Sequence, residues 1–86
     1  MSSAEARRRE IAAVVHGAIA AILPGLAASS IPGDRHLKDL GADSVERVEI
    51  ILSILHRLGA DEPLASFARL PDVDALVDFL WRREGA

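Results

Sequence analysis

Residues 40–45, Leu-Gly-Ala-Asp-Ser-Val, constrain the fold more than any other segment because they indicate where a helix begins. Gly41 permits backbone angles that other residues avoid, so the chain can turn there. Asp43 is a strong candidate to accept the unpaired N–H groups of a first helical turn. Ser44 then lies in that turn, beside free N–H donors and the positive end of the helix dipole. A phosphate on Ser44 would be stabilised at this position.

The composition favours helices throughout the chain. Half of the 86 residues are apolar, Ala and Leu dominate, and the only aromatic residues are Phe67, Phe79 and Trp81. Such a composition favours helices over sheets. The length allows a single domain over residues 1–86, and the absence of cysteine excludes disulfides. We therefore predict an all-α fold, a four-helix bundle with a short third helix and a long loop between the first and second helices.

The first predicted helix covers residues 4–23 and is ended by Pro24 and Gly25. Its apolar residues recur at helical spacing and form one stripe: Ile11, Val14, Val15, Ala18, Ile19 and Ile22. Turn-forming residues fill residues 26–42, where Leu37 and Leu40 are spaced to return to apolar neighbours. Long ordered loops in compact domains are usually functional, which suits a segment that delivers Ser44 to the surface.

The second predicted helix, residues 44–58, is unusually apolar. Its apolar side chains span an arc of about 220°, roughly twice what a surface helix needs. They are Val45, Val48, Ile50, Ile51, Leu52, Ile54, Leu55 and Leu58. Either this helix is buried on two sides, or part of its apolar surface is kept for partners. The burial of Leu52 distinguishes these two interpretations of the helix surface.

Two shorter helices are predicted to complete the bundle. A capped start at Asp61, Glu62 and Pro63 predicts a short third helix over residues 63–68. A fourth helix is predicted over residues 72–83. Asp72 caps its start, and basic Arg82 and Arg83 complement its negative end. Phe79 and Trp81 are expected to pack on the core rather than bind a ligand.

Charge and hydropathy argue against several functions. The net charge is −3 and no segment forms a basic patch, so nucleic acid is not an expected partner. Arg7, Arg8 and Arg9 precede an apolar stretch, but Glu5 and Glu10 are out of place in a secretory signal. The longest uninterrupted apolar run, residues 18–23, is too short to span a bilayer. A cytoplasmic protein without a membrane segment is expected.

The residues that could support catalysis or metal binding are poorly arranged for either. His16, His36 and His56 lie on three different predicted elements, and nothing in the sequence brings one to Ser44 as a base. The glycines that flank a hydrolase nucleophile are missing around this serine. No two histidines and no histidine–carboxylate pair recur at ligand spacing within one helix, and there are no thiols. We expect neither an enzyme nor a bound metal.

Residues 40–50, Leu-Gly-Ala-Asp-Ser-Val-Glu-Arg-Val-Glu-Ile, resemble the attachment motif of acyl carrier proteins. The resemblance extends over most of the chain, because an amphipathic helix precedes the motif and another follows it. It implies that Ser44 carries a covalent 4′-phosphopantetheine cofactor, moved from coenzyme A by a separate phosphopantetheinyl transferase. The terminal thiol of this group would hold an acyl intermediate as a thioester. By the same resemblance, Asp43 would lie near the magnesium ion of the transferase.

The resemblance also implies a docking surface on the second helix. Val45, Val48 and Leu52 would face outward and contact successive enzymes, and Glu46 and Glu49 would pair with basic groups around those contacts. Arg47, which interrupts the apolar arc, would lie in the same docking region. The core-facing residues would be Ile50, Ile51, Ile54 and Leu58, with Leu55 able to serve either side. The alternative that all eight apolar side chains pack inside a small bundle stays open.

The charge of the second helix bears on the pathway. Fatty-acid carriers tend to have a strongly acidic second helix, whereas Arg47 and Arg57 here balance its two acids. The motif is similar to small standalone carriers of β-branching cassettes in bacterial polyketide pathways. Acceptor carriers of such cassettes often have tryptophan six residues after the serine, and Ile50 occupies that place, which favours a donor or general role.

The expected partners follow from that resemblance: an acyltransferase, a ketosynthase or HMG-synthase-like enzymes of polyketide or fatty-acid synthesis, with the carrier itself a monomer. Two alternatives stay open. One is a non-catalytic helical protein-interaction bundle in which Ser44 is only a capping or first-turn residue. The other is an aminoacyl (peptidyl) carrier.

Overall fold

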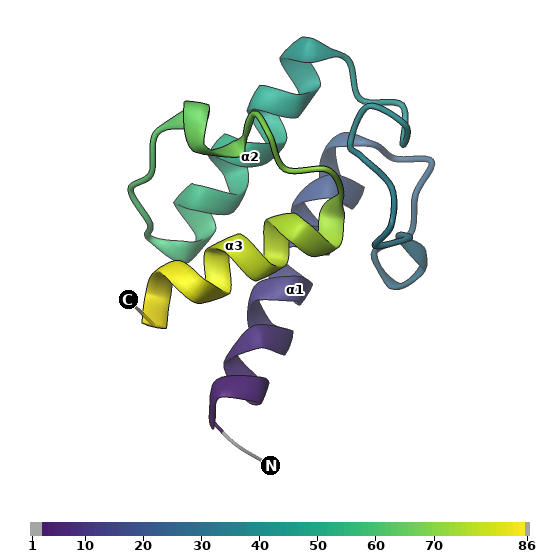
Figure 1. Cartoon of the computed structure of the whole chain (residues 1–86). Coiled ribbons are helices and arrows are strands. Elements are labelled where there is room, and N and C mark those ends of the chain that lie inside the picture. Colours follow the sequence, from purple (N-terminus) through teal and green to yellow (C-terminus); the bar gives the residue numbers. More distant parts are fainter. Residues whose placement is uncertain (1–2, 86) are drawn as a thin grey trace.

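The computed structural model describes residues 3–85, which form an all-α fold of three helices (Figure 1). The helices are α1 (Ser3–Ile22), α2 (Ser44–Leu58) and α3 (Val73–Gly85). Two short 3-10 turns, η1 (Ala28–Ser30) and η2 (Leu64–Phe67), lie in the connections. The predicted all-α class and the long loop between the first two helices are confirmed. The predicted four-helix bundle is confirmed only in part, because the third element is a 3-10 turn.

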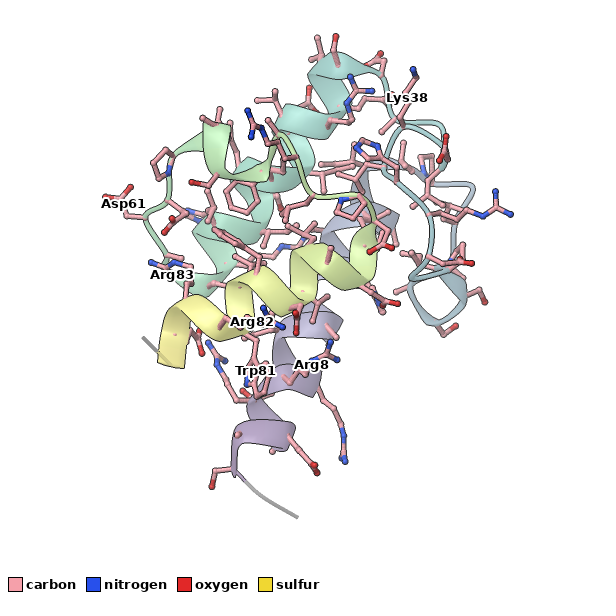
Figure 2. The ribbon with its side chains drawn as sticks, in the orientation of Figure 1. Arg8, Lys38, Asp61, Trp81, Arg82 and Arg83 are labelled. Carbon is pink, nitrogen blue, oxygen red and sulfur yellow. The ribbon has the colours of Figure 1, made fainter. Side chains whose placement is uncertain are left out.

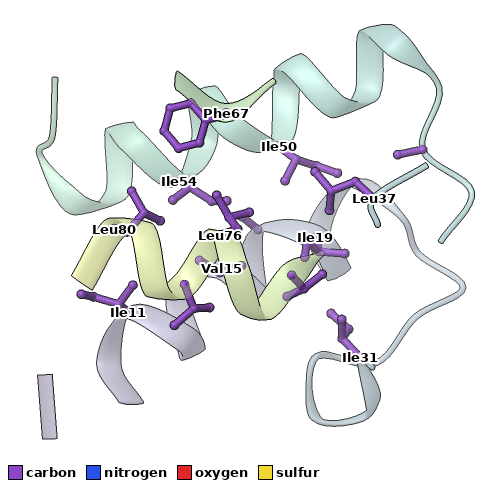
Figure 3. Packing of buried hydrophobic residues seen from close by; sticks show 14 of the residues in the cluster. Ile11, Val15, Ile19, Ile31, Leu37, Ile50, Ile54, Phe67, Leu76 and Leu80 are labelled. Carbon is purple, nitrogen blue, oxygen red and sulfur yellow. The ribbon is translucent and has the colours of Figure 1, made fainter. Parts of the chain in front are cut away.

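The three helices meet in one apolar core (Figure 3). Its seven largest fully buried side chains are Ile11, Val15, Ile19, Ile50, Ile54, Val73 and Leu80. Burying a side chain of this size contributes about 1.5–3 kcal/mol relative to leaving it in water. No polar or charged residue in the described chain is buried. Hydrophobic packing of the three helical stripes is therefore the main source of stability in this fold.

The connection between α1 and α2 is fixed by apolar anchors and by backbone contacts with α3. Ile31 and Leu37 are buried in the core, and Leu40 packs against it partly buried, as the sequence predicted for the two leucines. The N–H of Asp74 donates to the carbonyl of Gly33 at 2.9 Å. A Cβ atom at Gly33 would collide with the Asp74 carboxylate, which would have to turn away to make room. The long loop is thus tied to the first turn of α3.

The segment between α2 and α3 corrects the sequence prediction. The four residues of η2 form a 3-10 turn, and no side chain caps its start, so the predicted cap at residues 61–63 is wrong. Glu62 makes a different contact, in which its Oε2 accepts a hydrogen bond from Nε of Arg83 at 2.8 Å. A carboxylate is stabilised more by pairing with a guanidinium than by capping so short a turn.

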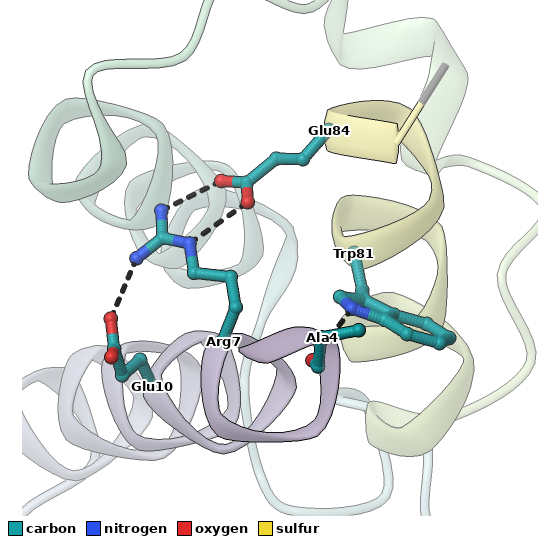
Figure 4. A network of polar contacts seen from close by, with 5 residues as sticks. All are labelled: Ala4, Arg7, Glu10, Trp81 and Glu84. Atoms are coloured by element: carbon teal, nitrogen blue, oxygen red, sulfur yellow. Dashed lines mark hydrogen bonds and ion pairs between the residues drawn. The ribbon is translucent and has the colours of Figure 1, made fainter. Parts of the chain in front are cut away.

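The start of α3 and its aromatic residues agree with the sequence prediction. Oδ1 of Asp72 accepts the N–H of Ala75 at 2.8 Å, which is the predicted cap. Phe79 packs edge-on against Phe67, with ring centroids 5.3 Å apart and planes inclined at 74°. Trp81 also packs against the core, and its indole N–H donates to the carbonyl of Ala4 at 3.1 Å (Figure 4).

The ends of α1 and α3 are joined by charged side chains (Figure 4). Nε and Nη2 of Arg7 donate to the two carboxylate oxygens of Glu84 at 2.8 and 2.7 Å, and Nη1 donates to Glu10 at 3.0 Å. These contacts raise the pKa of the Arg7 guanidinium and lower the pKa of Glu84. Arg8 lies over the Trp81 ring at 5.9 Å from its centroid (Figure 2). Ionic and aromatic contacts therefore hold the start of α1 and the end of α3 together.

Candidate functional site

The chain reaches α2 through a tight turn centred on Gly41. Gly41 has a φ of 102°, in the left-handed region that favours glycine. Its N–H donates to the carbonyl of Lys38 at 3.1 Å, and the N–H of Ala42 donates to that of Leu37 at 3.2 Å. Ala42 is buried, so it anchors the turn in the core. The turn thereby fixes the position of the following helix start.

Asp43 and Glu46 form a reciprocal cap at the start of α2. Oδ1 of Asp43 accepts the N–H of Glu46 at 2.8 Å, and Oε1 of Glu46 accepts the N–H of Asp43 at 3.0 Å. The predicted capping role of Asp43 is confirmed. The second half of the cap was missed, although an acidic residue three positions after the capping residue is its sequence signal.

Ser44 is the first residue of α2 and is exposed. Within residues 3–85, the N–H groups of Ser44 and Val45 have no protein acceptor, because the Asp43 carboxylate takes the N–H of Glu46. Unpaired N–H groups and the helix dipole make this end of the helix electropositive. The hydroxyl therefore lies where an attached or approaching phosphate is favoured.

The apolar surface of α2 is divided between the core and the solvent. Val45, Val48 and Leu52 have exposed fractions of 63%, 41% and 50%. We call these three residues the apolar strip. On the core side, Ile50, Ile54 and Leu55 are buried, and Ile51 and Leu58 pack against the core partly buried. The exposure of Leu52 favours the interpretation in which part of the helix surface is kept for partners over the one in which all eight residues are buried.

A cavity of about 430 Å³ opens beside Ser44, between α2, η2 and the connecting loops. Its apolar walls are contributed by Leu37, Val48, Ile51, Leu64, Phe67, Ala68, Leu70 and Leu76, and its polar lining by His36, Lys38, Ser44, Arg47 and Asp72. Sequence reasoning did not predict this cavity, because its walls come from four separate segments. It also missed Leu64, which is 43% exposed and lines the cavity together with Val48 of the apolar strip.

The histidines do not form a catalytic arrangement with Ser44. His36 lines the same cavity, but its Nδ1 accepts the backbone N–H of Lys38 at 3.0 Å. No hydrogen bond links Ser44 to a histidine in residues 3–85. The described residues also contain no group of three histidine or carboxylate side chains that could hold a metal ion. Over the same residues, no helix combines the length and apolar character needed to cross a membrane.

Taken together, the three-helix core, the capped start of α2 and the outward serine define a small helical domain built to present one hydroxyl. A family model described as a phosphopantetheine attachment site matches residues 13–80, and the chain belongs to this family. A search of curated proteins gave no match. Members of this family are non-catalytic carriers that hold 4′-phosphopantetheine on a serine. Phosphopantetheinyl transferases modify them, and synthase enzymes interact with them.

The site fits this cofactor. An exposed serine hydroxyl can be reached by a transferase, and the unpaired N–H groups beside it favour a phosphate. The adjoining cavity leaves space next to the Ser44 side chain.

Proposed function

We propose that Ser44 bears the 4′-phosphopantetheine arm and that this chain carries acyl groups in a polyketide pathway. The observation that supports Ser44 is its place at the start of an α-helix. The other serines within the matched residues lie elsewhere: Ser29 and Ser30 in η1, Ser53 inside α2 and Ser66 in η2. Of the serines in residues 13–80, Ser44 alone lies in the first turn of an α-helix, with the unpaired N–H groups of that turn beside it.

The residues around Ser44 position it and leave the chemistry to other proteins. When bound, the arm supplies a terminal thiol that carries an acyl group as a thioester. Asp43 and Glu46 hold the helix start in place, and Gly41 directs the chain so that the hydroxyl faces solvent. By family analogy, Asp43 would also lie near the magnesium ion of the transferase.

The apolar strip is proposed as the surface on which partner enzymes dock. Val45, Val48 and Leu52 follow Ser44 along one exposed face of α2. The partners would be the transferase, an acyltransferase, a ketosynthase or HMG-synthase-like enzymes. Around the strip, Glu46, Arg47 and Glu49 would make polar contacts. A carrier must leave each partner within one turnover, so small apolar contacts with fast dissociation suit the role.

The polyketide assignment is supported by the charge of α2. Its two glutamates are balanced by Arg47 and Arg57, so electrostatic steering is weak and apolar contact matters more. The position six residues after Ser44 holds Ile50, a fully buried core residue rather than the tryptophan of acceptor carriers. This supports a donor or general role in a β-branching cassette. We further propose that residues 1–86 form a single, monomeric carrier domain.

Loading by a promiscuous phosphopantetheinyl transferase tests the attachment site. After incubation with coenzyme A, intact-mass spectrometry is expected to show one adduct, localised to Ser44 by peptide mapping. Ser44→Ala should abolish the adduct while far-UV circular dichroism and the melting temperature stay close to those of the wild type. Ser30→Ala, at another exposed serine, should load normally. An unchanged mass of the wild-type chain would instead support the interaction bundle.

The kind of acyl group that the protein carries is tested on the form modified with 4′-phosphopantetheine. An acetyl- or malonyl-transferring enzyme from the same gene neighbourhood is expected to acylate the thiol, as seen by the further increase in mass. Acylation only by an amino-acid-activating enzyme would contradict the acyl assignment and favour an aminoacyl carrier.

The docking surface is tested by placing a charge on it. Leu52→Asp should slow acylation by such an enzyme while the fold is retained, because the side chain is half exposed. Ala13→Asp, at an exposed position on α1, is the matched control and should acylate at the wild-type rate. Equal rates for both variants would exclude Leu52 from the docking surface.

A further inference from the structure

Three basic side chains, His36, Lys38 and Arg47, line the cavity that Ser44 borders. Figure 2 shows Lys38 on the loop beside the start of α2. The acidic residue in the same lining is Asp72, and its Oδ1 accepts the N–H of Ala75 as the cap of α3. The polar rim near Ser44 therefore has an excess of positive charge.

Within residues 3–85, Lys38 and Arg47 have no carboxylate partner. Other cations of that part of the chain, Arg7, Arg8, Arg82 and Arg83 among them, do form ion pairs. The ammonium group of Lys38 makes no contact with a protein acceptor in that part of the chain. Arg47 donates once, from Nη1 to the carbonyl of Ala42 at 3.2 Å. This bond holds the guanidinium near the start of α2 and leaves its other N–H groups available.

The two acidic residues closest to Ser44 in sequence are already engaged. One oxygen of Asp43 and one of Glu46 accept backbone N–H groups in the reciprocal cap. They remain negatively charged, so an anion attached to Ser44 needs nearby cations to offset their repulsion. Arg47 lies three positions after Ser44 and thus on the same side of the helix, and Lys38 approaches from the loop.

We propose that Lys38 and Arg47 hold the phosphodiester of the prosthetic arm at the mouth of this cavity. The inference rests on the attachment of the arm to Ser44. The phosphodiester is a monoanion with free oxygens, to which ammonium and guanidinium groups donate charge-assisted hydrogen bonds. The N–H groups of Ser44 and Val45 add uncharged donors at the same end of α2. The arm therefore leaves Ser44 in a fixed direction, along the cavity side of the helix.

The test compares the melting temperatures of the unmodified and modified forms of each variant, so that any effect of a substitution on the unmodified fold cancels. In the wild type at low salt, modification should raise the melting temperature by about 2–4 °C, the size expected for an exposed ionic contact in a domain of this length. Added sodium chloride should reduce the rise. The Lys38→Gln/Arg47→Gln variant should lose most of the rise, because only the uncharged N–H donors of α2 remain. Lys38→Gln alone, which disturbs no contact of the unmodified fold, should show about half.

The matched control is Arg35→Gln/Arg69→Gln, which removes two exposed cations outside the cavity lining and should keep the full rise. The phosphorus NMR signal of the modified protein should shift in the Lys38 and Arg47 variants and not in the control. An equal rise in all variants, or no rise in the wild type, would overturn the inference and leave the attachment intact. Failure of the wild type to gain an adduct on Ser44 would refute the proposed function itself.

Discussion

The reciprocal cap at the start of α2 allows a quantitative prediction for Asp43→Ala. The substitution removes the acceptor that Oδ1 provides to the N–H of Glu46 at 2.8 Å. Asp43 is exposed, so its truncation leaves no cavity, and the freed N–H meets water. The expected loss is therefore that of a helix cap, about 1 kcal/mol. In a domain of this length it corresponds to a fall in melting temperature of about 4–8 °C.

Asp43→Asn separates the contribution of the hydrogen bond to stability from the contribution of the negative charge. The amide oxygen can still accept the N–H of Glu46, while the favourable interaction of the carboxylate with the helix dipole is lost, at a cost of about 0.3–1 kcal/mol. The expected order of stability is wild type, then Asp43→Asn, then Asp43→Ala. Urea unfolding followed by far-UV circular dichroism measures these differences. Asp39→Ala, which removes an exposed acidic side chain without a hydrogen bond, is the matched control.

Two results would refute this reasoning. If Asp43→Ala unfolds at the wild-type urea concentration, the cap contributes nothing to the folded state. If Asp43→Asn is as unstable as Asp43→Ala, the negative charge rather than the hydrogen bond stabilises the helix start.

Three further predictions concern the rest of the fold. Gly33→Ala should destabilise the protein because its Cβ meets the Asp74 carboxylate, and Asp74→Ala should recover part of the lost melting temperature in the double variant. Since Arg7 lowers the pKa of Glu84, this pair stabilises the fold above the ordinary glutamate pKa and less as the pH falls through the lowered value. The difference in unfolding free energy between wild type and Glu84→Gln should therefore shrink from about pH 7 to about pH 2.5. Ile54→Ala, in the fully buried core, should cost about 2–5 kcal/mol in urea unfolding.

Local features of the sequence were sufficient to predict the three α-helices and the start of α2, but not the 3-10 turn η2. Turn residues, caps and apolar spacing act within a few positions, so Gly41, Asp43 and Asp72 were assigned correctly. The division of α2 into a buried and an exposed side required the structure, because an apolar arc alone does not say what covers it. The exposed fraction of Leu52 provided that information.

Contacts between distant residues could not be predicted from local patterns. Glu62 was expected to help cap a short helix, but a guanidinium 21 positions later binds it instead. The close approach of Gly33 to the Asp74 side chain could not be predicted either, because Asp74 belongs to another element. The cavity beside Ser44 has the same origin, since its walls meet only after α2, η2 and the loops have packed.

The link between α1 and α3 has a practical consequence for handling the protein. The contacts of Arg7 with Glu84 and of Ala4 with Trp81 hold the first turn of α1 and the last turn of α3 together. In Figure 1 these turns lie at the end of the molecule opposite to the start of α2. A tag, resin or neighbouring module joined at either end would leave Ser44 pointing away from its support. Immobilised copies should therefore remain open to large enzymes in solution.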